Sequence, residues 1–171
     1  MTYDAVNRLT SVIYASSRRV TFQYDNAGRR TTMIDPGGTT TWVYNGRGEV
    51  TGNTQPGGYA LAMGYDAAGN RTTLTDPDGG VFTYTYDSVN RIDSARDPDG
   101  NRTTFQYDTA SQRTTLLDAN GNKRQYAYDS AGRLTTQLEL NASSNPILTM
   151  LDSYDGVGNR TGRNQDGVIA T

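Results

Sequence analysis

A tyrosine followed by an acidic or amide residue returns at an almost fixed interval along this chain of 171 residues. Seven copies read Tyr-Asp, and the copy at Tyr44 reads Tyr-Asn. The tyrosines are Tyr3, Tyr24, Tyr44, Tyr65, Tyr86, Tyr107, Tyr128 and Tyr154. Successive tyrosines are 20 or 21 residues apart, except for a last step of 26 residues. A fixed period near twenty residues indicates a tandem repeat, in which each unit buries its surface mainly against its neighbours.

Two turn signals divide each period. The residue four positions after each tyrosine is one that tolerates a left-handed backbone. These residues are Asn7, Gly28, Gly48, Gly69, Asn90, Ser111, Gly132 and Gly158. An aspartate at the first corner of a turn and such a residue at the fourth are typical of a type I turn followed by a left-handed residue. Half a period later a second turn has the form Asp-Pro-x-Gly, as in Asp76 to Gly79.

Two turns in each period predict two strands of about six residues, joined as an antiparallel hairpin. The predicted fold class is therefore all-β, with tandem antiparallel β-hairpins of about 21 residues forming one curled strip. We expect a single array of eight repeats and a segment of a longer array. The repeats lie near residues 1–16, 17–37, 38–57, 58–79, 80–100, 101–121, 122–146 and 147–171.

Alternation along a strand places each tyrosine and the residue two positions before it on the same face. That second position holds Phe22, Trp42, Met63, Tyr84, Phe105 and Tyr126. Six positions after each tyrosine, apolar residues and arginine alternate strictly. This series is Leu9, Arg30, Val50, Arg71, Ile92, Arg113, Leu134 and Arg160. From this alternation we expect successive hairpins to lie in two different environments, one lining an interior and one facing out.

Composition limits the classes of function. The absence of cysteine excludes disulfides and thiolate metal sites, and the absence of histidine removes the commonest general base. With 16 basic and 18 acidic residues and a pI near 5.0, a nucleic-acid partner is not expected. No apolar run approaches the roughly 20 residues of a membrane-spanning helix. We therefore expect no enzymatic activity, no cofactor and no bound metal.

The recurring motifs resemble those of one known family. Residues 128–134 read Tyr-Asp-x-x-Gly-Arg-Leu, residues 65–71 and 154–160 read Tyr-Asp-x-x-Gly-Asn-Arg, and Asp-Pro-x-Gly turns separate the copies. These residues resemble the RHS/YD repeat family over essentially the whole chain. In that family a long strip of β-hairpins spirals into a hollow shell. The shell encloses a toxic domain in bacterial polymorphic toxins and insecticidal toxin complexes, and animal teneurins use a similar barrel as an extracellular scaffold.

The resemblance implies a secreted or cell-surface structural scaffold without catalytic residues. Its implied partners are further RHS repeats of the same or another chain and an enclosed toxin or cargo polypeptide. Eight repeats are too few to close the family's shell. The family's shell-closing end with self-cleaving aspartates is also not found, so we expect no self-cleavage.

Two departures from the repeat are candidate partner-binding features. The five extra residues of the last step are predicted to form a loop around residues 141–146, with Asn141, Ser143, Ser144 and Asn145 as candidate contacts. Trp42 is the only tryptophan. We predict that its side chain packs in the core, and a platform that stacks on a sugar is the alternative. The aspartate-rich turns resemble half a calcium loop, but they are predicted to be plain turns because a distal bidentate glutamate is missing.

Two alternatives to an enclosing shell stay open. In the first, the chain is an adhesin-like module that binds a surface glycan or protein through exposed aromatic residues and the 141–146 loop. In the second, the chain self-associates into a filament, because unpaired strand edges at the ends of an array are templates for further strand pairing.

Overall fold

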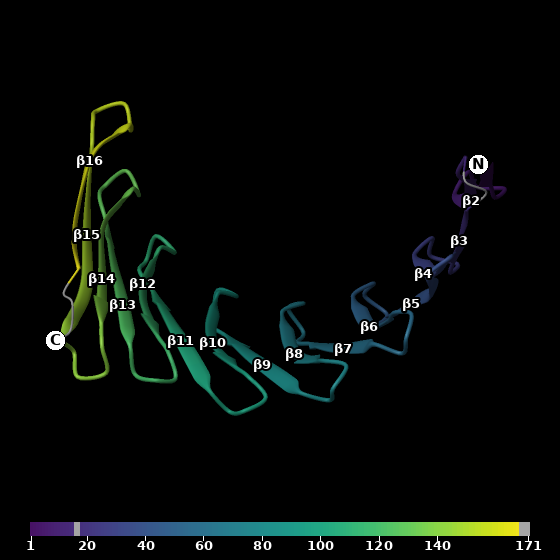
Figure 1. The fold of residues 1–171 in the computed structure, drawn as a ribbon, viewed down its shortest axis with the longest axis horizontal. Coiled ribbons are helices and arrows are strands. Elements are labelled where there is room, and N and C mark those ends of the chain that lie inside the picture. Colours follow the sequence, from purple (N-terminus) through teal and green to yellow (C-terminus); the bar gives the residue numbers. More distant parts are fainter. Residues whose placement is uncertain (16–17, 168–171) are drawn as a thin grey trace. The chain divides into compact units, whose positions relative to one another are not determined.

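The structure is a computed structural model that describes residues 1–15 and 18–167 (Figure 1). The chain divides into two compact units, Met1–Thr83 and Tyr84–Thr171, and the boundary falls inside one strand, β9. The predicted repeat boundary between residues 16 and 17 and the last four residues of the last repeat lie outside the described residues. The division into eight repeats stays a prediction.

Both units consist of antiparallel strands in which every strand pairs with its neighbours in the chain. The first unit contains β1 (Thr2–Tyr3), β2 (Leu9–Ile13), β3 (Arg19–Tyr24), β4 (Arg30–Asp35), β5 (Gly38–Tyr44), β6 (Val50–Thr54), β7 (Ala60–Tyr65), β8 (Arg71–Thr75) and the start of β9 (Val81–Tyr86). The second contains the end of β9, β10 (Ile92–Arg96), β11 (Arg102–Tyr107), β12 (Arg113–Leu117), β13 (Lys123–Tyr128), β14 (Leu134–Leu140), β15 (Pro146–Tyr154) and β16 (Arg160–Gly167).

The turn after each tyrosine has the predicted geometry. In the second repeat the Gly28 N–H donates to the Asp25 carbonyl at 3.0 Å, and the Asp25 N–H donates to the Arg29 carbonyl at 2.9 Å. Gly28 has a φ of 81°, in the left-handed region that glycine adopts without strain. The pairing register shifts further into the strands, because Tyr24 is opposite Arg30 and Gln23 is opposite Thr32, which leaves Thr31 as a β-bulge. The other seven residues predicted at this position also have positive φ.

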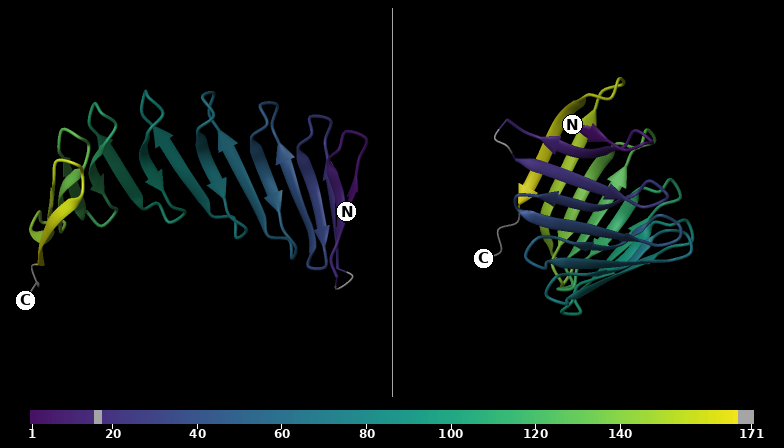
Figure 2. Two further views of the ribbon diagram at one scale, coloured as in Figure 1. Left: turned by 90° about the horizontal axis from the view of Figure 1, so that it is seen from above. Right: turned by 90° about the vertical axis from the view of Figure 1, so that its right-hand side faces the viewer.

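The second kind of turn lies at the opposite ends of the strands from the first kind, because the chain is an antiparallel meander (Figure 2). In the turn between β8 and β9, the Asp76 carboxylate accepts hydrogen bonds from the N–H groups of Asp78 and Gly80, at 3.0 and 2.7 Å. Gly79 has a φ of 87°. The aspartate therefore stabilises the turn through its side chain, as an Asx turn does.

The sheet has a single layer and almost no buried core. Among the described residues only Val12, Thr40 and Ser94 are buried, and Val12 is still 9% exposed. Apolar contacts run across neighbouring strands instead, for example between Met63 and Leu74 and between Leu74 and Phe82, which are directly opposite partners. Such cross-strand pairs contribute roughly 0.2–1 kcal/mol each, so the stability of the sheet is spread over many small contacts.

The two faces of the sheet differ in chemistry. We call the face that carries Tyr24, Phe22 and their equivalents the tyrosine face, and the opposite face the threonine face. The latter carries the residues next to each tyrosine and the threonines seven positions after it. Hydrogen bonds between Thr2 and Thr10 and between Ser153 and Thr161 join these two sets. The prediction of an all-β chain of antiparallel hairpins is confirmed.

Candidate functional site

Six of the repeated tyrosines place their hydroxyl on the backbone of the preceding hairpin, and together we call these tyrosines the tyrosine column. The Tyr24 hydroxyl donates to the Leu9 carbonyl at 2.8 Å, and the Tyr107 hydroxyl donates to the Ile92 carbonyl at 3.0 Å. The same contact joins Tyr44 to Arg30, Tyr65 to Val50, Tyr128 to Arg113 and Tyr154 to Leu134. The acceptor is always the residue six positions after the preceding tyrosine. Tyrosine recurs there because phenylalanine would leave this carbonyl without its donor.

An arginine five positions after the tyrosine forms a second junction between hairpins. Arg29 Nε binds the Asp25 carboxylate at 2.7 Å, while Arg29 Nη1 donates to the Asn45 carbonyl of the next repeat at 3.0 Å. The guanidinium carbon lies 4.7 Å from the centre of the Tyr44 ring, within cation–π range. Arg8, Arg91 and Arg133 make the same three contacts. We call this arrangement the arginine junction.

The arginine junction also perturbs the aspartate that it binds. The Arg29 backbone N–H and then the Arg29 guanidinium donate hydrogen bonds to the Asp25 carboxylate, and they lower the pKa of that carboxyl below its ordinary value. The pKa of Asp4, Asp87 and Asp129 is lowered by the equivalent contacts. These carboxylates are occupied by turn and junction hydrogen bonds, so they are not placed for acid–base chemistry.

The third repeat reaches the same result with other residues. Asn45 replaces the aspartate, and its side-chain amide donates to the Glu49 carboxylate, which stands where four other repeats have arginine. Arg47 then binds Glu49 at 2.9 Å and donates to the carbonyls of Asp66 and Ala67 in the next repeat. Asn45 and Glu49 thus replace the aspartate and the arginine of the junction, and Arg47 supplies the guanidinium that reaches the next turn. Position five in the sixth repeat is Gln112, whose N–H binds the Asp108 carboxylate at 2.8 Å.

Trp42 belongs to a stack on the tyrosine face. The guanidinium carbon of Arg30 lies 4.5 Å from the centre of the Trp42 ring and 5.8 Å from that of Phe22. Arg113 stacks on Tyr126 in the same way, at 4.8 Å. A sugar platform needs a free ring face, and Arg30 already covers one face of Trp42. The contacts favour the packing role that we assigned first to this tryptophan.

The two environments expected from the apolar and arginine alternation are not present. Arg30 and Leu134 each stand opposite the tyrosine of their own repeat, so both side chains lie on the tyrosine face. Their carbonyls accept the same tyrosine hydroxyl contact from the next repeat. The expectation was wrong because both hairpins have the same pairing register, so the residue six positions after the tyrosine falls on the same face in each. Arg30 and Arg113 stack the guanidinium on the ring two positions before the next tyrosine, and Arg160 lies 4.0 Å from the Asp152 carboxylate.

The predicted insertion loop at residues 141–146 is also corrected. Asn141–Asn145 form an ordinary second turn, in which the Asn141 side chain accepts from the N–H groups of Ser143 and Asn145 at 3.0 and 2.9 Å. Ser144 takes the left-handed position with a φ of 64°. The extra residues instead lengthen β14 to 7 residues and β15 to 9, and a register shift between Glu139 and Leu140 absorbs the unequal addition.

An ion pair between the exposed side chain of Arg163 and the covered carboxylate of Asp152, near the end of the chain, has no counterpart in the sequence prediction. Asp152 occupies the position two before Tyr154, where the other repeats carry a large side chain. Arg163 binds its carboxylate through two nitrogens at 2.7 and 2.6 Å, and the Asp152 side chain is only 7% exposed. The Arg163 hydrogen bonds lower the pKa of Asp152. The missing aromatic residue at this position was the signal that could have revealed the pair.

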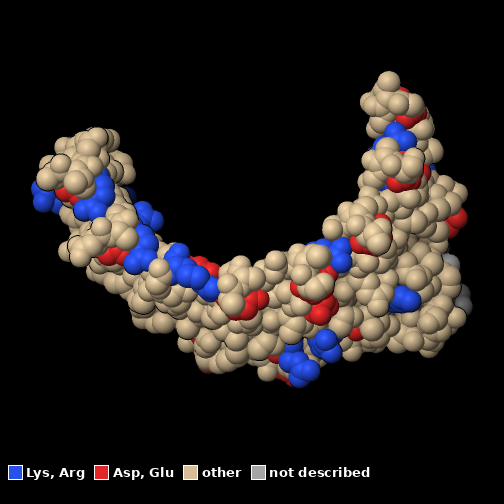
Figure 3. Space-filling view, turned by 180° about the vertical axis from the view of Figure 1, so that it is seen from behind, with Lys and Arg blue, Asp and Glu red and all other residues tan. Residues whose placement is uncertain are grey.

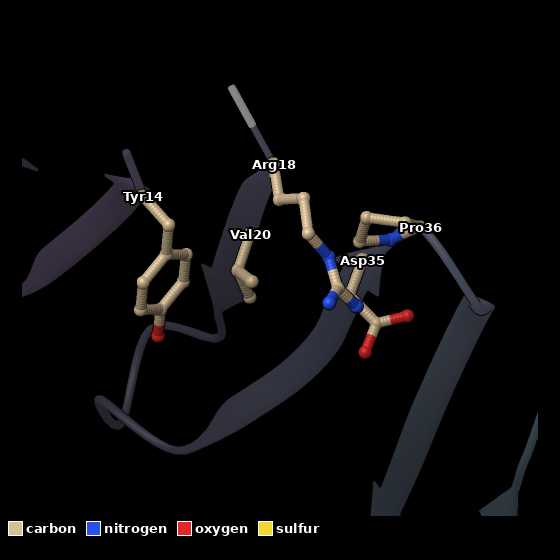
Figure 4. Close-up of a pocket in the computed structure, with 5 residues that line it drawn as sticks. All are labelled: Tyr14, Arg18, Val20, Asp35 and Pro36. Atoms are coloured by element: carbon tan, nitrogen blue, oxygen red, sulfur yellow. The ribbon is translucent and has the colours of Figure 1, made fainter. Parts of the chain in front are cut away.

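An open pocket of about 360 Å³ in the first unit is lined by Tyr14, Arg18, Val20, Asp35 and Pro36 (Figure 4). Arg18 and Asp35 give it one charge of each sign. Across residues 1–15 and 18–167 no group of three acidic side chains is placed to hold a metal ion. The same part of the chain contains no helix long and apolar enough to cross a membrane. Figure 3 shows acidic and basic side chains interspersed on the face in view.

Comparison with solved structures finds the same fold. A crystal structure of TcdB2-TccC3-TEV matches 97% of this chain and 11% of that chain, with a TM-score of 0.72 and 16% sequence identity. A crystal structure of TcdB2-TccC3 matches 98% of this chain and 12% of that chain, with a TM-score of 0.70 and 16% identity. A Tc holotoxin pore of Photorhabdus luminescens gives a TM-score of 0.60 at 16% identity, with 98% and 11% of the two chains covered. The chain therefore spans about a tenth of the length of these proteins.

No match was found among curated proteins. The RHS Repeat family model matches residues 3–40, 44–81, 65–102, 86–123 and 114–139. These segments cover most of the chain, and they contain seven of the eight repeated tyrosines and the arginine junctions of Arg8, Arg29 and Arg91. The period, the turn geometry and this match agree. The chain belongs to the RHS repeat family.

Proposed function

We propose that this chain is a wall segment of an RHS-type β-shell that encloses or displays a cargo polypeptide. The observation that carries the proposal is the way in which the hairpins are joined. Within each unit the tyrosine contact recurs from hairpin to hairpin, and the arginine junction accompanies four of these six contacts. Such an array grows by adding hairpins at its end and needs no central core. A single layer of this kind suits a wall with two accessible faces.

The similarity to TcdB2-TccC3 structures and to a Tc holotoxin pore supports a shell role at the level of fold. The proposed partners are further RHS repeats of the same or another chain and an enclosed toxin or other cargo. Curling of the strip, closure into a shell and a secreted or cell-surface location are parts of this proposal. We propose no catalytic role, because the turn aspartates of the repeats are engaged in hydrogen bonds that stabilise the fold.

The adhesin-like alternative gains no support from its candidate residues. Arg30 covers a face of Trp42, and Asn141, Ser143, Ser144 and Asn145 form an ordinary turn. The filament alternative has no contact in its favour either. We therefore advance the shell as the single proposed function.

Limited proteolysis of the natural gene product that carries these repeats tests the proposal. Polypeptide outside the repeats should resist subtilisin while the repeats are intact, and mass spectrometry identifies the protected peptides. Tyr107→Ala should open one junction and make those peptides cleavable. Tyr59→Ala is the matched control, because Tyr59 is 62% exposed and lies outside the tyrosine column. Equal cleavage in the intact protein and in Tyr107→Ala would contradict enclosure.

A further inference from the structure

Two arginines with no counter-charge face each other on the threonine face. Arg96 of β10 and Arg102 of β11 are directly opposite partners at the end of their hairpin, and both are exposed. Directly opposite side chains on one face have Cβ atoms about 5 Å apart, and like charges at this spacing destabilise a sheet. The free protein therefore holds two positive charges together at an energetic cost.

The neighbouring acids do not neutralise this pair. Asp97, which follows Arg96, accepts hydrogen bonds from the Asn101 N–H at 2.8 Å and from the Asn101 side-chain amide at 2.9 Å. Within the described residues neither arginine takes part in an ion pair, a side-chain hydrogen bond or a ring contact. By contrast, the arginines of the arginine junctions are bound to an aspartate and stacked on a tyrosine.

A third cation and an exposed apolar residue lie on the same face. Thr104, Leu117 and Lys123 follow one another as directly opposite partners across β11, β12 and β13. Leu117 is 40% exposed, and it lies in an open groove that Arg102 and Thr104 also line. Lys123 is two strands across from Thr104 and therefore about 12 Å from Arg102, given the usual strand spacing and the offset of two residues along the strand. Cations thus flank an apolar centre.

We propose that this face of β10–β13 binds an acidic polypeptide segment through Arg96, Arg102 and Lys123, with aliphatic side chains of the segment on Leu117. A carboxylate placed between the two guanidinium groups would accept charge-assisted hydrogen bonds from both and relieve their repulsion. This inference deepens the proposed function, since it describes the chemistry of a cargo segment that the wall would hold. A polypeptide is favoured over nucleic acid, because the exposed Leu117 at the centre of the site offers an apolar contact to aliphatic side chains.

The binding test uses a fluorescein-labelled eight-residue peptide of alternating glutamate and valine, titrated with the whole chain and followed by anisotropy. We expect saturable binding that weakens with salt and that is lost when glutamine replaces glutamate in the peptide. Arg96→Gln and Arg102→Gln should each weaken binding about tenfold. Arg19→Gln is the matched control, because Arg19 holds the place of Arg102 in another repeat but has Ile13 opposite it.

Several outcomes would overturn this inference. They are no saturable binding, equal loss of affinity in Arg19→Gln, and tighter binding of a single-stranded oligonucleotide of equal charge than of the peptide. A second readout needs no ligand. Arg102→Glu should raise the melting temperature of the free chain while abolishing peptide binding, whereas Arg19→Glu should not raise it. A lower melting temperature for Arg102→Glu would contradict the postulated repulsion.

The inference and the proposed function can fail separately. Peptide binding by the isolated chain does not require a closed shell, so it can persist when the proteolysis experiment shows no protected polypeptide. That result would retain the acidic-segment site and remove enclosure. Protection without peptide binding would retain enclosure and remove the site.

Discussion

The hydroxyl of Tyr154 donates a 2.8 Å hydrogen bond to the backbone carbonyl of Leu134, although the interval between the last two column tyrosines is lengthened to 26 residues. The other column tyrosines make this contact across 14 or 15 residues, and Tyr154 makes it across 20. The extra residues extend β14 and β15 away from the tyrosine, at the far ends of the two strands. The tyrosine contact between hairpins therefore keeps the same geometry when the strands of a hairpin become longer.

The tyrosine hydroxyl should contribute measurably to stability. Tyr107→Phe removes the donor to the Ile92 carbonyl and keeps the ring, so we expect the free energy of unfolding to fall by about 1 kcal/mol. Tyr59→Phe, at a residue outside the column that is 62% exposed, should have no measurable effect. Urea denaturation of both variants followed by circular dichroism gives the comparison. Equal stability of the two variants would mean that the hydroxyl contact contributes nothing.

The sixth repeat offers a place to add an arginine junction. Gln112 stands five positions after Tyr107, next to Asp108 and beside Gly132 of the following turn. Gln112→Arg should bind Asp108 and stack on Tyr128 as Arg91 binds Asp87 and stacks on Tyr107. We expect the free energy of unfolding to rise by about 0.5–1 kcal/mol in urea denaturation.

Arg91→Gln, which removes an existing arginine junction, is the matched counterpart of Gln112→Arg. Arg91→Gln removes the ion pair with Asp87, the hydrogen bond to the Asp108 carbonyl and the stacking on Tyr107. We expect a loss of about 1 kcal/mol in the same measurement. A loss in Arg91→Gln without any gain in Gln112→Arg would show that the sixth repeat cannot adopt the junction geometry. No effect in either variant would show that the junction is not stabilising.

The alternation six positions after each tyrosine should tolerate exchange. Ile92 is equivalent to Leu134, which lies opposite Tyr128 on the tyrosine face, and the next ring two positions before a column tyrosine is Phe105. In Ile92→Arg the guanidinium should stack on Phe105 as Arg113 stacks on Tyr126. We therefore expect a loss below about 1 kcal/mol and an unchanged circular dichroism spectrum. Complete unfolding of this variant would restore the idea of two environments that the structure contradicts.

The sequence predicted the strands and turns well because their signals are local. The left-handed residues from Asn7 to Gly158 follow from backbone sterics, and the side of each strand follows from alternation. The arginine junction was missed because it joins Arg91 to Asp108, 17 residues away, and depends on where the next hairpin lies. The five extra residues were assigned to a loop instead of to longer strands, because the turn between β14 and β15 was not recognised from the sequence. Asn141–Ser144 carries no proline or glycine, so the ordinary turn was not recognised.

Acid should weaken the chain through the aspartates of the arginine junctions. The pKa of Asp4, Asp25, Asp87 and Asp129 is lowered in the folded chain, mainly by the backbone N–H of the arginine four residues later. An unfolded aspartate titrates near about 3.9, so each lowered pKa stabilises the fold above that value. The contribution is lost as pH falls through the folded pKa, because the unfolded chain then binds protons more readily than the folded one.

We therefore expect a melting temperature that is flat between about pH 5 and 7 and that falls steadily below about pH 4. Thermal unfolding followed by circular dichroism in matched salt gives the curve. Asp87→Asn should lower the melting temperature at pH 7 and make the fall at low pH shallower, because one of the titrating groups is gone. Asp99→Asn, at an exposed turn residue, is the control that should leave the curve unchanged. An acid transition identical in Asp87→Asn and the unmodified chain would show that the junction carboxylates do not govern acid stability.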